Sequence, residues 1–245
     1  MMQRIVAAET LDSLAENDPA AMRSRRDLRR AHRVMGTRSI LLRALRDMMG
    51  TQSAKRSMRI LELGAGDGSL MLGVARALAP EWRKVEITLL DRQSLVDEAT
   101  IDAYAELGWE ASPKTVDVLD WAAEAGCNGS ELARWDMIIA NLFLHHFQGT
   151  QLDALLSAIA TRCLRFFACE PRRARLALVG SHLIGAIGTN AVTREDAVLS
   201  VRAGFCGNEI ALLWPDVDGW TTKEYPAGLF SHCFRAERTP ATERH

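Results

Sequence analysis

Short apolar runs alternate with amphipathic segments along the chain from about residue 58 onward. The apolar runs predict strands at 59–63, 85–90, 115–118, 137–140 and 164–168. Helical periodicity between them predicts helices at 69–79, 93–107, 120–133 and 150–161. Strands that are apolar throughout and alternate with helices are typical of a parallel sheet that is covered on both faces. The pattern therefore predicts an α/β fold with a doubly wound, mostly parallel sheet.

The last part of the chain follows a different pattern. Residues 220–225 and 230–237 are two strand candidates, and the turn Pro226-Ala227-Gly228 separates them. Such close spacing permits an antiparallel hairpin, which a pure series of parallel strands would not contain. We therefore expect seven strands in all, with an antiparallel strand at the C-terminal end.

The first fifty residues are predicted to be helical and are rich in arginine. Asp18 and Pro19 match a helix N-cap followed by proline at the first helical position. A second helix is expected after Gly36-Thr37, and the segment holds ten Arg against six acidic residues. We expect an N-terminal helical cap at 1–50, followed by the main domain at 51–245.

A long helical insertion is expected at about 172–215, between the fifth and sixth strands. It is predicted to contain a helix at 173–187, a turn at 188–190 and a second helix from Thr193, with Asp196 at its capping position. Its apolar residues could form a lid with the N-terminal helices over an apolar pocket. They could equally complete the core.

Composition and charge restrict the class of protein. Hydrophobic residues make up 48% of the 245 residues and charged residues 25%, as in ordinary globular proteins. The formal net charge of −1 provides no overall field that would attract nucleic acid or an anionic membrane. No apolar run approaches the ~20 residues of a membrane span, and acidic residues interrupt the N-terminal segment where a signal peptide would be apolar. We expect a cytoplasmic protein.

The five cysteines do not indicate a metal site. None of them forms a C-x-x-C pair, so the sequence signals neither a zinc ribbon nor a disulfide framework. No metal ligand is predicted from the sequence.

A glycine-rich turn follows the first predicted strand and carries most of the chemical information. Gly64, Gly66 and Gly68 form a G-x-G-x-G pattern directly before a helix, and Glu62 precedes it. Glycines allow the backbone to turn sharply and to approach a ligand closely. A dinucleotide fingerprint would need its third glycine at Ser69, and a carboxylate beside the turn suits a cationic ligand better than a pyrophosphate. A nicotinamide enzyme is therefore the least favoured class.

This segment resembles the first motif, E-x-G-x-G-x-G, of class I S-adenosylmethionine-dependent methyltransferases, and the resemblance extends over about residues 58–237. It implies S-adenosylmethionine as the cofactor and the Rossmann-like methyltransferase fold. The implied cofactor-binding residues are Glu62, Gly64, Ala65, Gly66, Gly68, Asp91, Arg92, Asp117, Val118, Asn141 and Leu142.

The resemblance also assigns roles to the acidic residues after the next two strands. Asp91 is the acid that would bind the ribose hydroxyls. Asp117 would bind the adenine amino group, with Asp120 as a second candidate that could instead cap a helix. The segment from Trp135 to Phe147 resembles the fourth motif, which faces the transferred methyl group.

The fourth motif bears on the acceptor. Asn141 is followed by Leu142 and not by the prolines of the [DNS]-P-P-[YFW] motif, so methylation of exocyclic amines on nucleic-acid bases is disfavoured. The L-H-H-F sequence resembles that of enzymes that methylate quinones, polyketides and other phenolic natural products. The resemblance thus implies methylation of a small molecule, with O-methylation of a phenolic or polyketide-like acceptor as the leading hypothesis. C-methylation stays open.

A phenol must lose its proton near the moment of attack, and histidine is a suitable base near neutral pH. His145 and His146 are the catalytic candidates, with a slight preference for His146, although either could simply pack inward. Arg29 and His32 in the N-terminal helix and Arg194 in the insertion are candidate acceptor-binding residues. An arginine-rich helix is also typical of a solvated surface.

Two other functions remain open on the sequence alone. Methylation of RNA or of a protein side chain is supported only by the arginine-rich N-terminal segment. A regulatory protein that binds S-adenosylmethionine without turnover is the third hypothesis. We expect a small-molecule acceptor as the partner, no binding of nucleic acid, and a chain that can form a homodimer.

Overall fold

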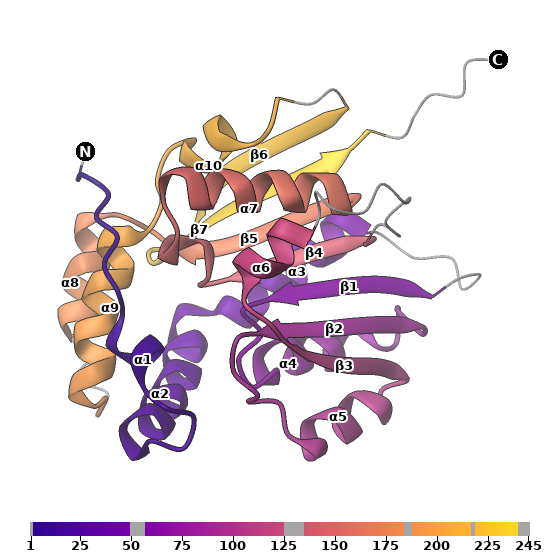
Figure 1. Ribbon diagram of the computed structural model, residues 1–245, viewed down its shortest axis with the longest axis horizontal. Coiled ribbons are helices and arrows are strands. Elements are labelled where there is room, and N and C mark those ends of the chain that lie inside the picture. The colour runs from indigo at the N-terminus through magenta and orange to yellow at the C-terminus, as the bar shows by residue number, and fades with distance from the viewer. Residues whose placement is uncertain (1, 50–56, 125–134, 184–187, 217–218, 240–245) are drawn as a thin grey trace.

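The central sheet has seven strands in the order β3-β2-β1-β4-β5-β7-β6 (Figure 1). The computed structural model describes residues 2–49, 57–124, 135–183, 188–216 and 219–239. Strands β1 to β5 are parallel, and β7 is antiparallel to both β5 and β6. This arrangement confirms the predicted fold class. The strands are β1 (Met58–Leu63), β2 (Val85–Asp91), β3 (Trp109–Thr115), β4 (Met137–Asn141), β5 (Arg165–Pro171), β6 (Trp220–Ala227) and β7 (Ser231–Arg238).

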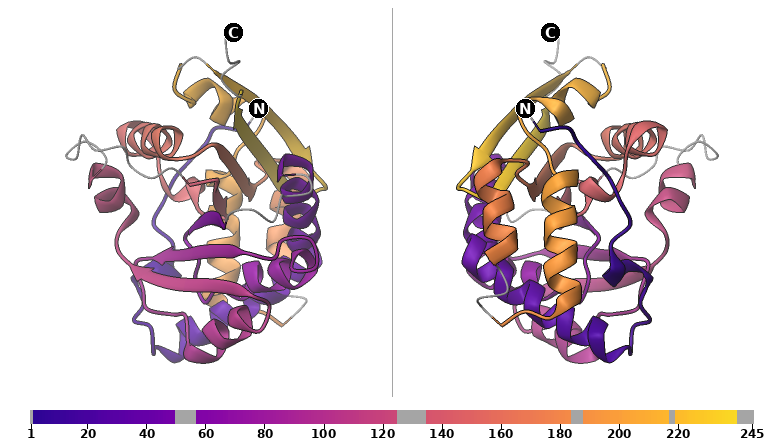
Figure 2. Two further views of the ribbon diagram at one scale, coloured as in Figure 1. Left: turned by 90° about the vertical axis from the view of Figure 1, so that its right-hand side faces the viewer. Right: turned by 90° about the vertical axis from the view of Figure 1, so that its left-hand side faces the viewer.

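Helices cover both faces of the sheet, as Figure 2 shows. Alternate residues of β1 enter two different cores: Met58 and Ile60 pack into one, and Leu61 and Leu63 into the other. The first core includes residues of α3, α4 and α5, and the second includes residues of α6, α7 and α10. These helices are α3 (Thr37–Met49), α4 (Ser69–Leu78), α5 (Glu98–Ala105), α6 (Val118–Ala123), α7 (Gly149–Arg162) and α10 (Glu209–Leu213).

The remaining helices lie together beyond the carboxyl ends of the parallel strands (Figure 1). They are α1 (Thr10–Ser13), α2 (Pro19–Met35), α8 (Arg175–Leu183) and α9 (Ala191–Ala203). The Asp18 side chain accepts hydrogen bonds from the amides of Ala20 and Ala21, which confirms the predicted N-cap of α2. Residues of α3 pack into the main core, whereas α2 lies outside it. The division of the chain at residue 50 into a cap and a main domain stays a prediction.

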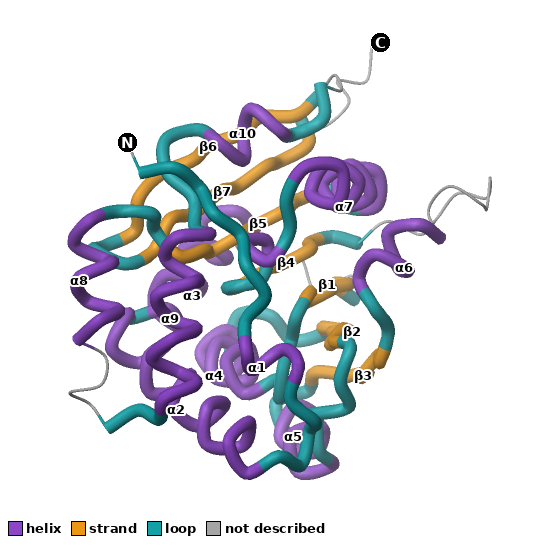
Figure 3. The backbone as a smooth tube through the Cα atoms, turned by 60° about the vertical axis from the view of Figure 1, so that its left-hand side comes forward, coloured by secondary structure: helices purple, strands orange, loops and turns teal. Residues whose placement is uncertain are grey.

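An N-terminal segment, residues 2–14, crosses the carboxyl ends of the strands (Figure 3). Arg4 donates to the carbonyl oxygens of Ala203 and Phe147 at one end of this path, over 2.8 and 2.9 Å. Gln93, just after β2, donates to the carbonyl oxygen of Leu14 at the other end. The segment therefore covers the edge of the sheet where the predicted site residues lie.

The third strand was predicted at the wrong place. It occupies Trp109–Thr115 and not 115–118, because it is the edge strand and most of its side chains are exposed. An exposed edge strand needs no apolar run, so the periodicity gave no signal for it. The apolar residues Val116 and Val118 belong to the loop and to the start of α6.

Other boundaries also differ from the prediction. Asp97 is the N-cap of α5, so this helix begins later than residue 93. Asp196 is not a cap, because α9 begins at Ala191 and Asn190 caps it. Much of the predicted helix at 120–133 and the last residues of the one at 173–187 fall outside the described residues. Within the described ranges, no helix is long and apolar enough to cross a membrane.

Candidate active site

The glycine turn joins β1 to α4 at the centre of the sheet edge. Gly64, Gly66 and Gly68 all have positive φ values, between 57° and 71°. At Gly64 a Cβ atom would lie 2.2 Å from the ring of Phe143, so any other residue would force that ring to move and would also be strained by the positive φ. The position of a Cβ at Gly66 has no atom within 4 Å, so this part of the turn faces open space. Ala65 is buried and donates its amide to the carbonyl oxygen of Leu90.

Two buried acceptor oxygens beside this turn have no hydrogen-bond partner within the described part of the chain. They are Oε2 of Glu62 near the end of β1 and Oδ1 of Asn141 at the end of β4. Burial, followed by the charges of Asp91 and Asp67, raises the pKa of Glu62 well above its usual range. Buried polar atoms without partners are costly, so the pair suits a ligand that donates hydrogen bonds or carries positive charge.

Asp91 ends β2 and supports the glycine turn directly. Its Oδ2 accepts the amide of Gly66 over 2.8 Å, and its Oδ1 accepts the amide of Gln93 over 3.0 Å. The neighbouring Arg92 is exposed and pairs with Asp12 of the N-terminal segment, with 3.3 Å between Nη2 and Oδ1. The structure thus places both residues at the same edge as the glycine turn.

Asp117 lies beyond the end of β3 and caps α6. Its carboxylate accepts the amide of Leu119 over 2.7 Å, so Asp117 and not Asp120 is the capping residue. Val118 is buried directly after it. One carboxylate oxygen of Asp117 is engaged in the cap, and its side chain is exposed.

The backbone is strained where β4 leads into the histidine pair. Leu142 has a φ of 49°, the left-handed region that a branched side chain rarely adopts. Its amide donates to the carbonyl oxygen of Cys169 in β5. Such strain is characteristic of functional sites, where the surrounding structure holds it in place. It turns the chain into the short helix η2 (Leu144–His146).

His145 is fully enclosed between two carboxylates. Its Nδ1 lies 2.9 Å from Oε2 of Glu170 in β5, and its Nε2 lies 3.3 Å from Oε1 of Glu9. Glu170 also accepts the backbone amides of Phe143, Leu144 and His145. Burial alone would lower the pKa of His145, but hydrogen bonds to Glu170 and Glu9 outweigh it and raise the pKa to about 9. The ring is therefore held as a cation.

His146 is more accessible than its neighbour. Its side chain is 21% exposed, and its Nδ1 lies 3.0 Å from Oδ2 of Asp12. The two imidazole rings are 4.2 Å apart between centroids. No hydrogen bond involves Nε2 of His146 within the described ranges, so this nitrogen is available to a ligand.

Two of the three predicted acceptor-binding residues lie beside the glycine turn. Arg29 pairs with Asp67, at 2.5 Å between Nη1 and Oδ2. His32 has a buried Nε2 without a partner in the described residues, and burial lowers its pKa to about 4 although Asp67 acts in the opposite direction. Both residues are thus near Asp67 of the glycine turn.

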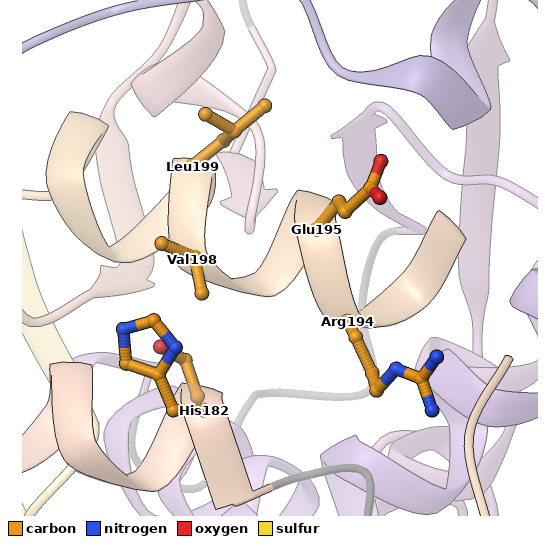
Figure 4. A pocket seen from close by; sticks show the side chains of 6 residues that line it. His182, Arg194, Glu195, Val198 and Leu199 are labelled. Carbon is orange, nitrogen blue, oxygen red and sulfur yellow. The ribbon is translucent and has the colours of Figure 1, made fainter. Parts of the chain in front are cut away.

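Arg194, the third predicted acceptor-binding residue, belongs to α9. It lines a groove of about 590 Å³ between α8 and α9 (Figure 4). The other lining residues, Ser181, His182, Glu195, Val198 and Leu199, also belong to these two helices. Within the described residues, no hydrogen bond or ion pair joins Arg194 to the glycine turn or to the histidine pair.

Comparison with known proteins identifies the fold. No family model and no curated protein sequence matches the chain. The plantazolicin methyltransferase BpumL in complex with SAH is similar in structure, with a TM-score of 0.59, 13% identity and coverage of 91% of each chain. The fold is the Rossmann-like methyltransferase fold.

Two further structures share this methyltransferase fold. Magnesium protoporphyrin IX methyltransferase (ChlM) from Synechocystis PCC 6803 with bound SAH has a TM-score of 0.53 and 18% identity, over 87% of this chain and 86% of that one. The CurJ carbon methyltransferase has a TM-score of 0.51 and 17% identity, over 82% of this chain and 54% of that one. At such low identity the likeness establishes the fold alone.

Sequence reasoning missed the carboxylates that surround the histidines in this methyltransferase fold. Glu9 and Asp12 come from the N-terminal segment, more than 130 residues away along the chain, and no local pattern links them to the histidine pair. Glu170 did carry a signal, because an acidic residue within an apolar strand must find a buried partner.

Proposed function

We propose that this protein is an S-adenosylmethionine-dependent methyltransferase that acts on a small molecule. The observation that carries the proposal is the pair of buried acceptor atoms, on Glu62 and Asn141, beside a glycine turn with an open face. The ammonium group of S-adenosylmethionine would satisfy such atoms. A pyrophosphate would gain no positive partner at Glu62 and would be repelled by the carboxylate of Asp91 nearby.

The other predicted cofactor residues follow the same sheet edge. Asp91 would bind the ribose hydroxyls while it keeps the amide of Gly66, and Asp117 with Val118 would bind the adenine. We reassign Arg29 and His32 from the acceptor to the amino-acid end of the donor, because both lie near Asp67. When bound, S-adenosylmethionine supplies a methyl group on a sulfonium, which is transferred to a nucleophile by in-line displacement.

The histidine pair would serve the acceptor. We propose an acceptor hydroxyl, phenolic or polyketide-like, whose proton passes to Nε2 of His146 as the new O–CH3 bond forms and the S–CH3 bond breaks. Asp12 would orient His146 through Nδ1, as a carboxylate orients a catalytic histidine in other enzymes. His145 would hold the loop in place through Glu170.

The structural neighbours support a small-molecule acceptor, since they include a plantazolicin methyltransferase and a magnesium protoporphyrin IX methyltransferase. The net charge of −1 gives no support to an RNA acceptor. We also propose that the protein is cytoplasmic and that it forms a homodimer.

Methyl transfer can be tested with a panel of phenols, quinones and polyketide-like compounds. The purified protein, S-adenosylmethionine and each compound are incubated, and S-adenosylhomocysteine and the methylated product are measured. We expect at least one compound to be methylated on oxygen. Donor binding without transfer to any acceptor, tRNA and protein extracts included, would favour a regulatory protein that has no turnover.

Donor binding should depend on pH through Glu62. Burial shifts the pKa of Glu62 upward and so favours its protonated form in the free protein, whereas an ammonium beside it would favour the charged carboxylate. Binding should therefore release a proton, and affinity should weaken as the pH falls. Calorimetry in two buffers of different ionisation heat measures this release. Glu62→Gln should abolish it, and proton uptake by the unmodified protein would contradict the assignment.

A further inference from the structure

Side chains from two distant parts of the chain meet at the histidine pair. Glu9 comes from the N-terminal segment, and His145 and His146 from the loop after β4. One ligand atom from each lies within 4.8 Å of the other two. We propose that these residues form a binding site for a divalent metal ion of the zinc class.

The number of N–H groups that the His145 ring can offer motivates the proposal. Its two ring nitrogens face the carboxylate oxygens of Glu170 and Glu9, at 2.9 and 3.3 Å. A neutral imidazole has a single N–H, so one of the two contacts brings two lone pairs together unless a positive charge lies between them. A proton or a metal ion can supply that charge. The same carboxylates attract a doubly charged ion more strongly than a single proton.

The spacing suits a small tetrahedral ion. Ligand atoms that bind zinc at about 2.0–2.1 Å lie about 3.3–3.5 Å apart when the angles are tetrahedral. The distance between Oε1 of Glu9 and Nε2 of His145 is 3.3 Å, within that range. His146 lies on the same short helix, so a modest movement of its ring brings a third donor into place.

The surroundings also resemble the outer shell of a metal site. Glu170 holds Nδ1 of His145, which leaves Nε2 for an ion, and metal-bound histidines commonly carry such a carboxylate on the other nitrogen. Ser200 donates to Glu9, and Asp12 adds a further carboxylate beside His146. The nearby guanidinium of Arg4 donates to backbone carbonyl oxygens of His145 and Phe147.

The donor set selects the ion. Two imidazoles and one carboxylate favour zinc and related transition metals, whereas magnesium and calcium prefer oxygen ligands alone. A bound ion would fasten the N-terminal segment to the loop after β4. The ion would also occupy nitrogen atoms of the histidine pair, so zinc should inhibit methyl transfer. This consequence rests on the proposed function.

The test is a titration of tag-free, chelator-treated protein with zinc chloride, followed by calorimetry and by thermal unfolding. We expect one ion per chain with micromolar or tighter affinity, and a higher unfolding temperature. Glu9→Gln should weaken binding at least tenfold. The matched control is Glu16→Gln, because Glu16 lies in the same part of the chain but accepts the amide of Ser94.

Saturable binding that Glu9→Gln weakens and Glu16→Gln does not would support the site. Absence of saturable binding, or equal affinity in Glu9→Gln, would overturn it. Cobalt offers an independent readout, because coordination by His145 and His146 changes its visible spectrum. These measurements use neither donor nor acceptor, so a failure of the metal site is distinct from a failure of the proposed function. If zinc binds at this site but leaves the turnover of methyl transfer unchanged, the predicted inhibition is wrong.

Discussion

Replacing His146 with alanine is expected to lower turnover by about 10²- to 10⁴-fold, the usual contribution of a general base. The side chain is partly exposed, and the carboxylate of Asp12 is its ion-pair partner, so its removal should leave the fold intact. The affinity for S-adenosylmethionine should stay within about twofold, because the residue lies at the acceptor end of the site. Steady-state kinetics with the best acceptor, together with donor titration, gives both quantities.

The assay should contain a chelator, so that the proposed metal site does not affect the comparison. Unchanged turnover would transfer the role to His145 or leave the reaction without a base. His145→Ala is a less clean test, because it removes the charged partner of the buried carboxylate of Glu170 and is expected to destabilise the fold.

The second large effect is expected at Asp91. Asp91→Ala removes the carboxylate that would bind the ribose. It also removes the acceptor of the hydrogen bond that the amide of Gly66 donates. Donor affinity should fall more than tenfold, about 1.4 kcal/mol or more. Titration of the variant with S-adenosylmethionine measures the loss.

Asp97→Ala is a suitable control for that measurement. Asp97 lies in the same connection between β2 and α5, and its carboxylate accepts the amide of Thr100 as the helix cap. Its removal should lower the folding stability slightly, because the helix loses its cap, and should leave donor affinity unchanged. Equal donor affinity in Asp91→Ala and in the unmodified protein would remove Asp91 from the site.

The sequence predicted those parts of the molecule whose signals are local. A buried strand followed by glycines with positive φ specifies the turn at Gly64, and an acid after an apolar strand marks Asp91. The L-H-H-F segment likewise lies where strand β4 ends. Each of these features depends on residues within a few positions of one another.

The features that could not be predicted depend on long-range packing or on exposure. Strand β3 is an exposed edge, so its residues carry no apolar pattern. Asp196 accepts the amides of Thr10 and Leu11, nearly two hundred residues earlier, and so holds the N-terminal segment. His32 in α2 lies near Asp67 of the glycine turn, a proximity between distant segments that no local pattern predicts.

The central claim is that the glycine turn, Glu62 and Asn141 bind S-adenosylmethionine. Calorimetric titration of the purified protein with S-adenosylmethionine and, separately, with S-adenosylhomocysteine tests it most directly. We predict saturable binding of at least one of them at micromolar strength. Absence of binding by both, in protein shown to be folded, would contradict the methyltransferase proposal and leave the fold as the established result.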